Sequence, residues 1–450
     1  MKRLFSYILA LAFSSTLVTA QQTVGLFDND SLAQNGYSLF TVSNNSYLID
    51  NCGNEINSWS HEQGRGLSSY LTEEGTFMFC GRSESVAFPG GGAAGYLAEY
   101  DWEGNLLWSH DLASDQHQQH HDFEILPNGN IIAIVWELKD ALTSIQNGSS
   151  TSITYWPDYL IEFEKVGSDE ISIVWEWHAW DHLIQAFDPL KENFGVISEH
   201  PELIDINAYP PTNPSLGDWM HLNSIDYNYE RDELLISVHH FNEIWIIDHS
   251  TTSAEAASHS GGQYDKGGDL LYRWGNPEAY QRGTTDDHRL FFQHDAKWIP
   301  SGYPNEGAIS IFNNGVGQPQ GNYASIVVIN PPLDNEGEYL LEGLNSYGPE
   351  DVSWLFTNDP PENLYTGHQG GTQALPNGNF LINSTEQGWV IEATPQGEIV
   401  WDYRIPISFN APMNQGDFWS ALNGTAFRCE RYLPDFVGFD DVDIQVGEPI

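Results

Sequence analysis

The chain has 450 residues, of which 16 are Lys or Arg and 63 are Asp or Glu, so its formal net charge is −47. Hydrophobic residues make up 40% of the sequence and aromatic residues 13%, which is enough apolar material for a large core and excludes a disordered acidic chain. So strong a negative charge repels phosphate backbones and anionic lipid head groups. We therefore expect neither nucleic acid nor a membrane surface as a partner.

The first twenty residues have the layout of a secretory signal peptide. Met1-Lys2-Arg3 is basic, residues 4–17 are mostly apolar, and Val18-Thr19-Ala20 supplies small residues. No later apolar run approaches the ~20 residues of a membrane-spanning helix. The sequence predicts a signal peptide at 1–20, a secreted or periplasmic protein without a membrane span, a propeller domain at 21–435 and an acidic tail at 436–450.

Short strands that end in tryptophan recur along the chain at irregular spacings. They end at Trp59, Trp108, Trp175, Trp274, Trp354 and Trp401. Hairpin signals accompany them, because Leu-Pro-Asn-Gly-Asn occurs at both 126–130 and 375–379, and Asn-Gly between apolar runs favours a tight β-turn. Helical periodicity is scarce, since Gly, Pro and Asn interrupt the chain nearly throughout.

This pattern predicts an all-β fold, namely a six-bladed β-propeller with four-stranded antiparallel blades. Residues 37–59 supply three strands of one blade and residues 425–432 its innermost strand, so N- and C-terminal strands pair to close the ring. A long β-sandwich would not explain the repeated tryptophan endings. Cys52, Cys80 and Cys429 are too few for a disulfide scaffold, and a bridge to Cys429 near the closing blade is left open.

Histidines stand at the start of four consecutive inner strands. They are His121, His221, His294 and His368. Inner strands line the axis of a propeller, and second strands end at the same mouth, which adds His239 and His240 and, from the closing blade, Arg428. The resulting funnel could be structural, could bind a metal, or could perform anion chemistry, because imidazoles serve as nucleophile, acid, base or donor. Metal-binding spacings such as His-Glu-x-x-His are absent, so we expect no metal.

At these residues the chain resembles the arylsulfate sulfotransferase family, from about Gly95 to Tyr432. The resemblance is densest in His-His-Asp-Phe-Glu-Ile-Leu-Pro-Asn-Gly-Asn (120–130), Trp-Met-His-Leu-Asn-Ser-Ile-Asp-Tyr (219–227), Leu-Leu-Tyr-Arg-Trp-Gly-Asn-Pro (270–277) and Gln-His-Asp-Ala-Lys-Trp-Ile (293–299). It implies a secreted six-bladed propeller that moves a sulfuryl group from an aryl sulfate donor to a phenolic acceptor, without PAPS or another cofactor.

The resemblance also implies roles for single residues. His294 matches the nucleophile, which would carry the sulfuryl group as a sulfohistidine in a ping-pong reaction. His221 and Asn223 match a histidine and an asparagine that bind sulfuryl oxygens, and His121 matches an acid or base for the phenolic oxygen. The other members of the funnel are expected to bind substrate: His239, His240, His368 and Arg428.

One position departs from the family pattern. Where the family has an arginine after the second strand, this chain has Ser237-Val238-His239-His240. Either the missing cation comes from His239, whose pKa acidic surroundings would raise, or from an arginine elsewhere such as Arg428, or the activity differs from that of the family.

Two other functions remain open at this stage. A non-enzymatic propeller could bind an extracellular glycan or sulfated polymer on exposed aromatic platforms, for which the candidates are Trp156, Trp177, Trp180 and Trp219. A metal-dependent lyase or hydrolase is the third alternative.

Overall fold

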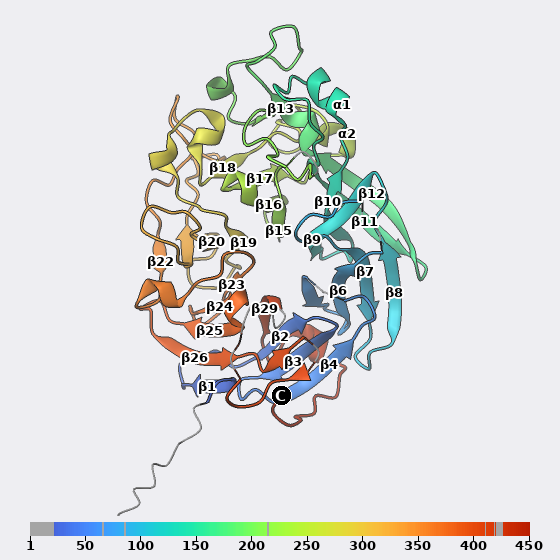
Figure 1. Ribbon diagram of the computed structural model, residues 1–450, viewed down its shortest axis with the longest axis vertical. Helices are drawn as coiled ribbons and strands as arrows, with labels where there is room; N and C mark the ends of the chain where they lie inside the picture. The colour runs from blue at the N-terminus through green and yellow to red at the C-terminus, as the bar shows by residue number, and fades with distance from the viewer. Residues whose placement is uncertain are drawn as a thin grey trace, which may run out of the picture.

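The computed structural model describes residues 22–64, 67–84, 87–213, 216–409, 411–417, 419 and 426–450. Within these residues, six antiparallel sheets surround a central axis as the blades of a β-propeller (Figure 1), so the predicted fold is confirmed. The proposed signal peptide at 1–20 lies outside the described residues. No helix in the described part of the chain is long and apolar enough to cross a membrane.

Five blades have four strands each and the sixth has five. From the axis outward, the closing blade has β29 (Ala426–Tyr432), β2 (Tyr37–Val42), β3 (Asn45–Asp50) and β4 (Glu55–Ser60), and the next blade has β5 (Ser69–Leu71), β6 (Phe77–Arg82), β7 (Gly95–Tyr100) and β8 (Leu106–Asp111). The third blade has β9 (His117–Ile125), β10 (Ile131–Glu137), β11 (Asp158–Val166) and β12 (Glu170–His178), and the fourth has β15 (Leu222–Asn228), β16 (Glu233–Val238), β17 (Glu243–Asp248) and β18 (Tyr272–Trp274). The fifth blade has β19 (His294–Trp298), β20 (Ile309–Asn313), β21 (Ser325–Ile329) and β22 (Trp354–Phe356), and the last has β23 (Gly371–Ala374), β24 (Phe380–Ser384), β25 (Trp389–Ala393), β26 (Ile399–Arg404) and β1 (Gly25–Asn29).

Both ends of the described chain close the ring. As predicted, β29 pairs with β2, with Tyr432 opposite Tyr37. The sequence did not predict that β1 would add a fifth, outermost strand to the last blade by pairing with β26. The last residues return to the closing blade, where Pro449 bridges Asn54 and Phe439 packs its ring 5.3 Å from that of Tyr37.

The six recurring tryptophans all lie on the fourth strand of their blades, and each indole N–H reaches the neighbouring blade. The donor and acceptor residues are Trp59 and Asp101, Trp108 and Glu170, Trp175 and Thr251, Trp274 and Pro349, Trp354 and Pro395, and Trp401 and Asn51. Five of these bonds end on a backbone carbonyl and the third on a threonine hydroxyl. The sequence repeat therefore marks a ring of contacts that fastens each blade to the next.

Insertions within and between the blades build the upper part of the molecule in Figure 1. The parallel pair β13 (Leu183–Ile184) and β14 (Ile204–Asp205) lies between two blades, whereas α1 (Ala141–Gln146) lies between β10 and β11 and α2 (Ser253–Ala256) between β17 and β18, each within one blade. A small hairpin of β27 (Ile407–Ser408) and β28 (Ala411–Pro412) lies elsewhere. Short 3-10 turns include η1 (Ala179–His182), η3 (His239–Phe241) and η7 (Thr385–Gln387).

Three of the four tryptophans predicted as sugar platforms are buried. Trp177 and Trp219 are 0% exposed and Trp156 is 4% exposed. That prediction is wrong, because Trp177 and Trp219 belong to the largest buried core cluster and Trp156 to a smaller one with Phe88 and Trp136; of the four, only Trp180 is partly accessible.

The three cysteines are free thiols. Cys52 is exposed, whereas Cys429 is buried in β29 and Cys80 is buried in β6, one blade away from the closing blade. Burial raises the pKa of both Cys80 and Cys429 to about 12, so neither is a reactive thiolate at neutral pH.

Candidate functional site

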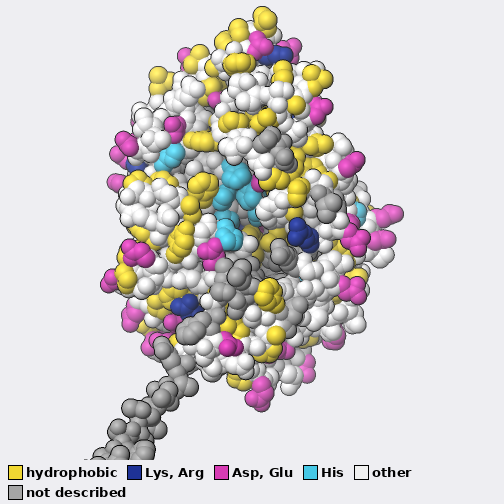
Figure 2. Space-filling view, in the orientation of Figure 1, with side chains coloured by type: hydrophobic (Ala, Val, Ile, Leu, Met, Phe, Trp, Pro, Cys, Tyr) yellow, Lys and Arg dark blue, Asp and Glu magenta, His cyan; other side chains and the backbone are white. Residues whose placement is uncertain are grey.

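Histidine side chains gather in the hollow at the centre of the face shown in Figure 2. The ring centroids of His121 and His221 are 4.5 Å apart, those of His221 and His239 are 5.0 Å apart, and those of His239 and His294 are 4.9 Å apart. His240 stacks on His221 at 4.8 Å. The fold thus brings five of the predicted histidines into one cluster, which we call the histidine cluster.

The backbone at or next to each of the four histidines predicted at the inner strands is left-handed, which is rare outside glycine. His121 and His221 have φ of 55° and 57°. In the next two blades the left-handed residue is the one after the histidine, Asp295 (φ 50°) and Gln369 (φ 62°). The four histidines therefore do not share one equivalent position, as the repeat suggested: His121 lies within β9, His221 directly precedes β15, His294 begins β19 and His368 precedes β23. Such conformations cost of order 1–3 kcal/mol and persist where the surroundings hold them.

His294 is held at both ring nitrogens. Its Nδ1 lies 2.8 Å from Oδ1 of Asn314, and the Asn314 amide nitrogen donates to the carbonyls of Thr366 and Gln369. The Asn314 oxygen must therefore face His294 and accept a hydrogen bond from Nδ1–H, which leaves the lone pair on Nε2. The backbone N–H of Gln369 donates to Nε2 at 3.1 Å. Burial lowers the pKa of His294 to about 3, although the Asn314 contact opposes this shift, so the ring is neutral.

His221 is the cation of the cluster. Its Nδ1 lies 2.6 Å from Oδ2 of Asp218. Burial opposes a charge on His221, but the Asp218 carboxylate outweighs burial and the pKa of His221 is raised. Burial likewise opposes the carboxylate, yet His221 lowers the pKa of Asp218. An imidazolium with Nδ1 engaged in this way keeps its Nε2–H for a ligand.

His121 stands at the end of a buried chain of three titratable groups. Its Nδ1 lies 2.8 Å from Nδ1 of His120, and Nε2 of His120 lies 2.7 Å from Oδ1 of Asp158. The His120 ring stacks on Trp136 at 3.9 Å, which fixes its plane. Burial lowers the pKa of both histidines and raises that of Asp158 well above its usual range, so all three groups are driven toward their neutral forms.

His239 does not replace the family arginine as a cation. Burial and the neighbouring histidines lower its pKa well below 6.5, and burial lowers that of His240 to about 4. The expectation of a raised pKa for His239 was wrong because desolvation outweighs the distant acidic surface. His239 and His240 do lie at the mouth, in the 3-10 turn that follows β16.

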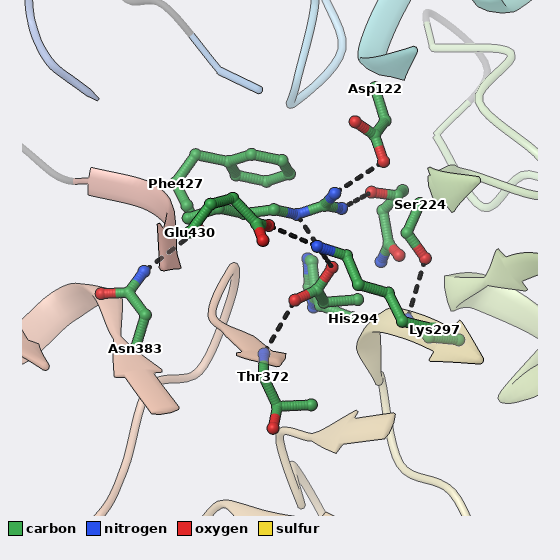
Figure 3. A network of polar contacts seen from close by, with 12 residues as sticks. Asp122, Ser224, His294, Lys297, Thr372, Asn383, Phe427 and Glu430 are labelled. Atoms are coloured by element: carbon green, nitrogen blue, oxygen red, sulfur yellow. Dashed lines mark hydrogen bonds and ion pairs between the residues drawn. The ribbon is translucent and has the colours of Figure 1, made fainter. Parts of the chain in front are cut away.

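Arg428 is committed to a polar network one step beyond the histidines along the inner strands (Figure 3). Its guanidinium lies 2.6 Å from Asp122 and 3.2 Å from Asp295, the residues after His121 and His294, and it donates to the Asn223 carbonyl. Its side chain is 3% exposed. The guanidinium charge is therefore balanced by carboxylates, and Arg428 links four blades instead of presenting a free cation.

The remaining predicted residues are at the margins of the cluster. The amide nitrogen of Asn223 donates to the Gln293 carbonyl, so it positions the loop before His294. His368 is at the rim, where its side chain is 57% exposed and Nδ1 lies 2.6 Å from Glu386.

Sequence reasoning missed four of the groups that orient the histidines: His120, Asp158, Asp218 and Gln369. It also missed a clamp of three glycines, 90–92, that lies against the cluster. A Cβ on Gly92, whose φ is 76°, would stand 2.0 Å from the ring of His121. The Pro-Gly-Gly-Gly run and the His-His doublet were visible signals, whereas the contact of Asp158 bridges distant strands.

One part of the cluster could hold a metal ion. Asp218, His221 and His240 each offer a ligand atom within 4.8 Å of the others. In the structure these atoms already have protein partners, because His221 binds Asp218 and Nδ1 of His240 lies 3.2 Å from the Trp219 carbonyl.

The family model for arylsulfotransferases (ASST) matches residues 29–329, which is more than half of the chain and includes His121, His221 and His294. The chain belongs to the arylsulfotransferase family. Membership supports an enzyme that transfers sulfuryl groups and acts on small molecules, and the resemblance seen in the sequence is confirmed.

No curated protein matches this arylsulfotransferase-family chain. Among solved structures, a protein of unknown function from Bacteroides caccae is 12% identical with a TM-score of 0.43, over 82% of this chain and 94% of that chain. A virginiamycin B lyase from Staphylococcus aureus, crystallised with quinupristin, is 10% identical with a TM-score of 0.40, over 90% of this chain and 98% of that chain.

Proposed function

We propose that this chain transfers a sulfuryl group from an aryl sulfate ester to a phenol by a ping-pong reaction through a sulfohistidine at His294. The observation that carries the proposal is the fixed tautomer of His294, a buried neutral imidazole with its lone pair on Nε2. A nucleophilic histidine must be unprotonated at the moment of attack, and burial keeps it so across the physiological range.

In the first half-reaction Nε2 of His294 attacks sulfur. The S–N bond forms, the bond from sulfur to the phenolic oxygen breaks, and that oxygen takes the electron pair. The Gln369 N–H, released from Nε2, would then donate to a sulfuryl oxygen, and Asn314 would continue to accept from Nδ1 of the sulfonated ring. The His221 imidazolium would supply the charged donor that the family obtains from arginine.

The hydrogen-bonded groups Asp158, His120 and His121 would supply the proton that the leaving phenolate takes up. With Asp158 neutral, its O–H donates to His120, His120 donates from Nδ1 to His121, and His121 presents Nε2–H to the leaving phenolate. When the phenolate takes this proton, each bond in the chain reverses and Asp158 becomes a carboxylate. In the second half-reaction the acceptor phenol returns its proton to His121 while its oxygen attacks the sulfohistidine, which restores His294 and Asp158.

Aromatic side chains next to the cluster fit an aryl ring. Phe292 lies 5.1 Å from His239, and Phe427 lies 6.0 Å from His121, measured between ring centroids. Phe292 is partly exposed, so a donor or acceptor phenol could stack on it, whereas Phe427 is 1% exposed and backs His121 from within the protein. The proposed reaction needs no PAPS, and a secreted or periplasmic location is proposed from residues 1–20.

The test is turnover of a chromogenic aryl sulfate by the purified protein in chelator, with and without a phenol acceptor. We expect a burst of one phenol per enzyme, acceptor-dependent turnover and a sulfur-labelled histidine that chases onto the acceptor. His294→Ala should lower turnover by about 10³-fold or more, whereas His110→Ala, which removes a half-buried imidazole on β8 outside the cluster, should not. Full turnover by His294→Ala would refute the assignment.

Glycan binding without catalysis is disfavoured by the burial of Trp156, Trp177 and Trp219. Tight binding of a sulfated polymer, unchanged in His294→Ala and without any sulfate transfer, would reinstate it. Activity lost in chelator would instead favour a metal-dependent enzyme.

A further inference from the structure

A second cluster of metal-binding side chains lies in the insertions, apart from the histidine cluster. His182 ends η1, which follows β12, whereas His259 and Asp269 lie in the segment between β17 and β18 of the next blade. One donor atom from each lies within 4.8 Å of the other two. Both Nδ1 atoms approach the same carboxylate oxygen, Oδ1 of Asp269, at 2.8 Å for His182 and 2.7 Å for His259.

The hydrogen bonds of His182 indicate which of its nitrogens has the lone pair. Nε2 lies 2.8 Å from the Ala256 carbonyl, which can only accept, so Nε2 carries the proton. In a neutral His182 the Nδ1 atom then carries the lone pair, and this atom faces the Oδ1 oxygen of Asp269. Two lone pairs 2.8 Å apart need a proton between them, on the ring or on the carboxyl group, or a metal ion.

The surroundings of His182 are those of a metal ligand. A ligating histidine almost always donates its other N–H to a carbonyl or carboxylate, which fixes the ring, and Ala256 supplies that carbonyl. The ring of Trp177 stacks on His182 at 5.7 Å, and His182 is 0% exposed. The ring is therefore oriented before any ion arrives.

The other two ligands leave room for an ion to enter. The His259 side chain is 61% exposed and lines a cavity of about 360 Å³, together with Asp181, Glu192 and His200. Zinc ligands at about 2.0–2.1 Å in a tetrahedron stand about 3.3 Å apart, so the present contacts would open by roughly 0.5 Å. The exposed His259 can make that movement while His182 stays in place, and the cavity provides space for a fourth ligand such as water.

We propose that His182, His259 and Asp269 form a zinc site that clips the insertions of two neighbouring blades together. Two imidazoles and one carboxylate suit zinc better than calcium, which prefers oxygen ligands. The net charge of −47 also favours cation binding at the surface. This site is separate from the histidine cluster, so the experiment measures zinc binding and not sulfuryl transfer.

The experiment titrates chelator-treated protein with zinc in competition with a chromophoric chelator. We expect one equivalent of tightly bound zinc in the wild type, at least tenfold weaker binding in His259→Ala, and an increase in Tm on zinc addition that His259→Ala lacks. His200→Ala, on the wall of the same cavity, and His240→Ala, in the histidine cluster, should each retain the equivalent. Calcium should not compete for it.

The unfolding midpoint of metal-free His259→Ala should equal that of the metal-free wild type, since the side chain is largely exposed. Zinc binding that survives His259→Ala, or that is lost in His240→Ala, would place the ion elsewhere and overturn the proposal. A wild type that binds no zinc would overturn it as well, and would indicate that a proton alone joins His182 to Asp269.

Discussion

Asp158→Asn tests the proton chain that ends at His121. The substitution keeps the size of the side chain but removes the O–H that would donate to His120, so the chain can no longer deliver a proton to the leaving phenolate. The alternative donor is His121 itself as an imidazolium. That second cation would lie 4.5 Å from the His221 imidazolium, measured between ring centroids. At an effective dielectric constant of about 20 this repulsion is about 3.7 kcal/mol, or a factor of about 500 in rate.

The loss should depend on the leaving group. A donor whose phenol is acidic leaves as a phenolate and needs little protonation, so its burst rate should fall only a few-fold. For a donor whose phenol has a pKa near 10, the rate of the first half-reaction should fall about 10²–10³-fold. Stopped-flow bursts with a series of aryl sulfates would therefore give a steeper dependence on leaving-group pKa in Asp158→Asn than in the wild type.

Asp169→Asn is the matched control, because Asp169 is an exposed carboxylate on the β11–β12 hairpin of the same blade. It should leave the dependence unchanged. A loss in Asp158→Asn that is equal for all donors would show that Asp158 only supports the fold, and an unchanged rate with every donor would refute the proton chain.

Three further predictions concern the clamp, the cation and the ring of tryptophans. Gly92→Ala should abolish turnover, since its Cβ would stand 2.0 Å from the His121 ring, whereas Gly104→Ala has the same left-handed strain in open space and should remain active in the same assay. Asp218→Asn should move the alkaline limb of the pH profile of kcat/KM to lower pH. The Asp218 carboxylate raises the pKa of His221, so its loss should lower that pKa and His221 should lose its charge at a lower pH. An unmoved limb would contradict His221 as the cation. Trp401→Phe should cost about 1–3 kcal/mol in urea unfolding by leaving a carbonyl without its donor, and no measurable loss would remove the tryptophan ring from the account of stability.

The sequence was sufficient for the fold because the repeat has a physical cause. Each fourth strand needs an indole N–H to reach the next blade, so tryptophan recurs at that place even though the loop lengths vary. The fifth strand, β1, was missed because its residues are largely exposed and lack a burial pattern that distinguishes a strand from a loop. Its pairing with β26 is decided by the ring closure, which only the folded chain defines.

The site could be predicted only in part. His121, His221 and His294 were identified because they stand in motifs near the start of inner strands. Asp158 could not be, because it opens β11, a strand separated from β9 by β10, and no local pattern shows that it faces His120. The charge of His239 was misjudged because composition describes the surface of the protein, whereas burial decides the protonation of this ring.

The charges of the cluster also bear on which esters it accepts. Among the described residues of the cluster, His221 has a raised pKa and serves as the one imidazolium, paired with Asp218, while His239 and His294 are neutral. The charge of Arg428 is balanced by the carboxylates of Asp122 and Asp295. A sulfate monoester brings one negative charge, which the imidazolium and the neutral donors can hold. A phosphate monoester brings close to two, and the extra charge would be desolvated without a partner in a protein of net charge −47, at a cost of several kcal/mol. We therefore expect aryl phosphates with the same leaving group to react at least 10²–10³-fold more slowly than aryl sulfates, and comparable rates would mean that a cation other than His221 serves the site.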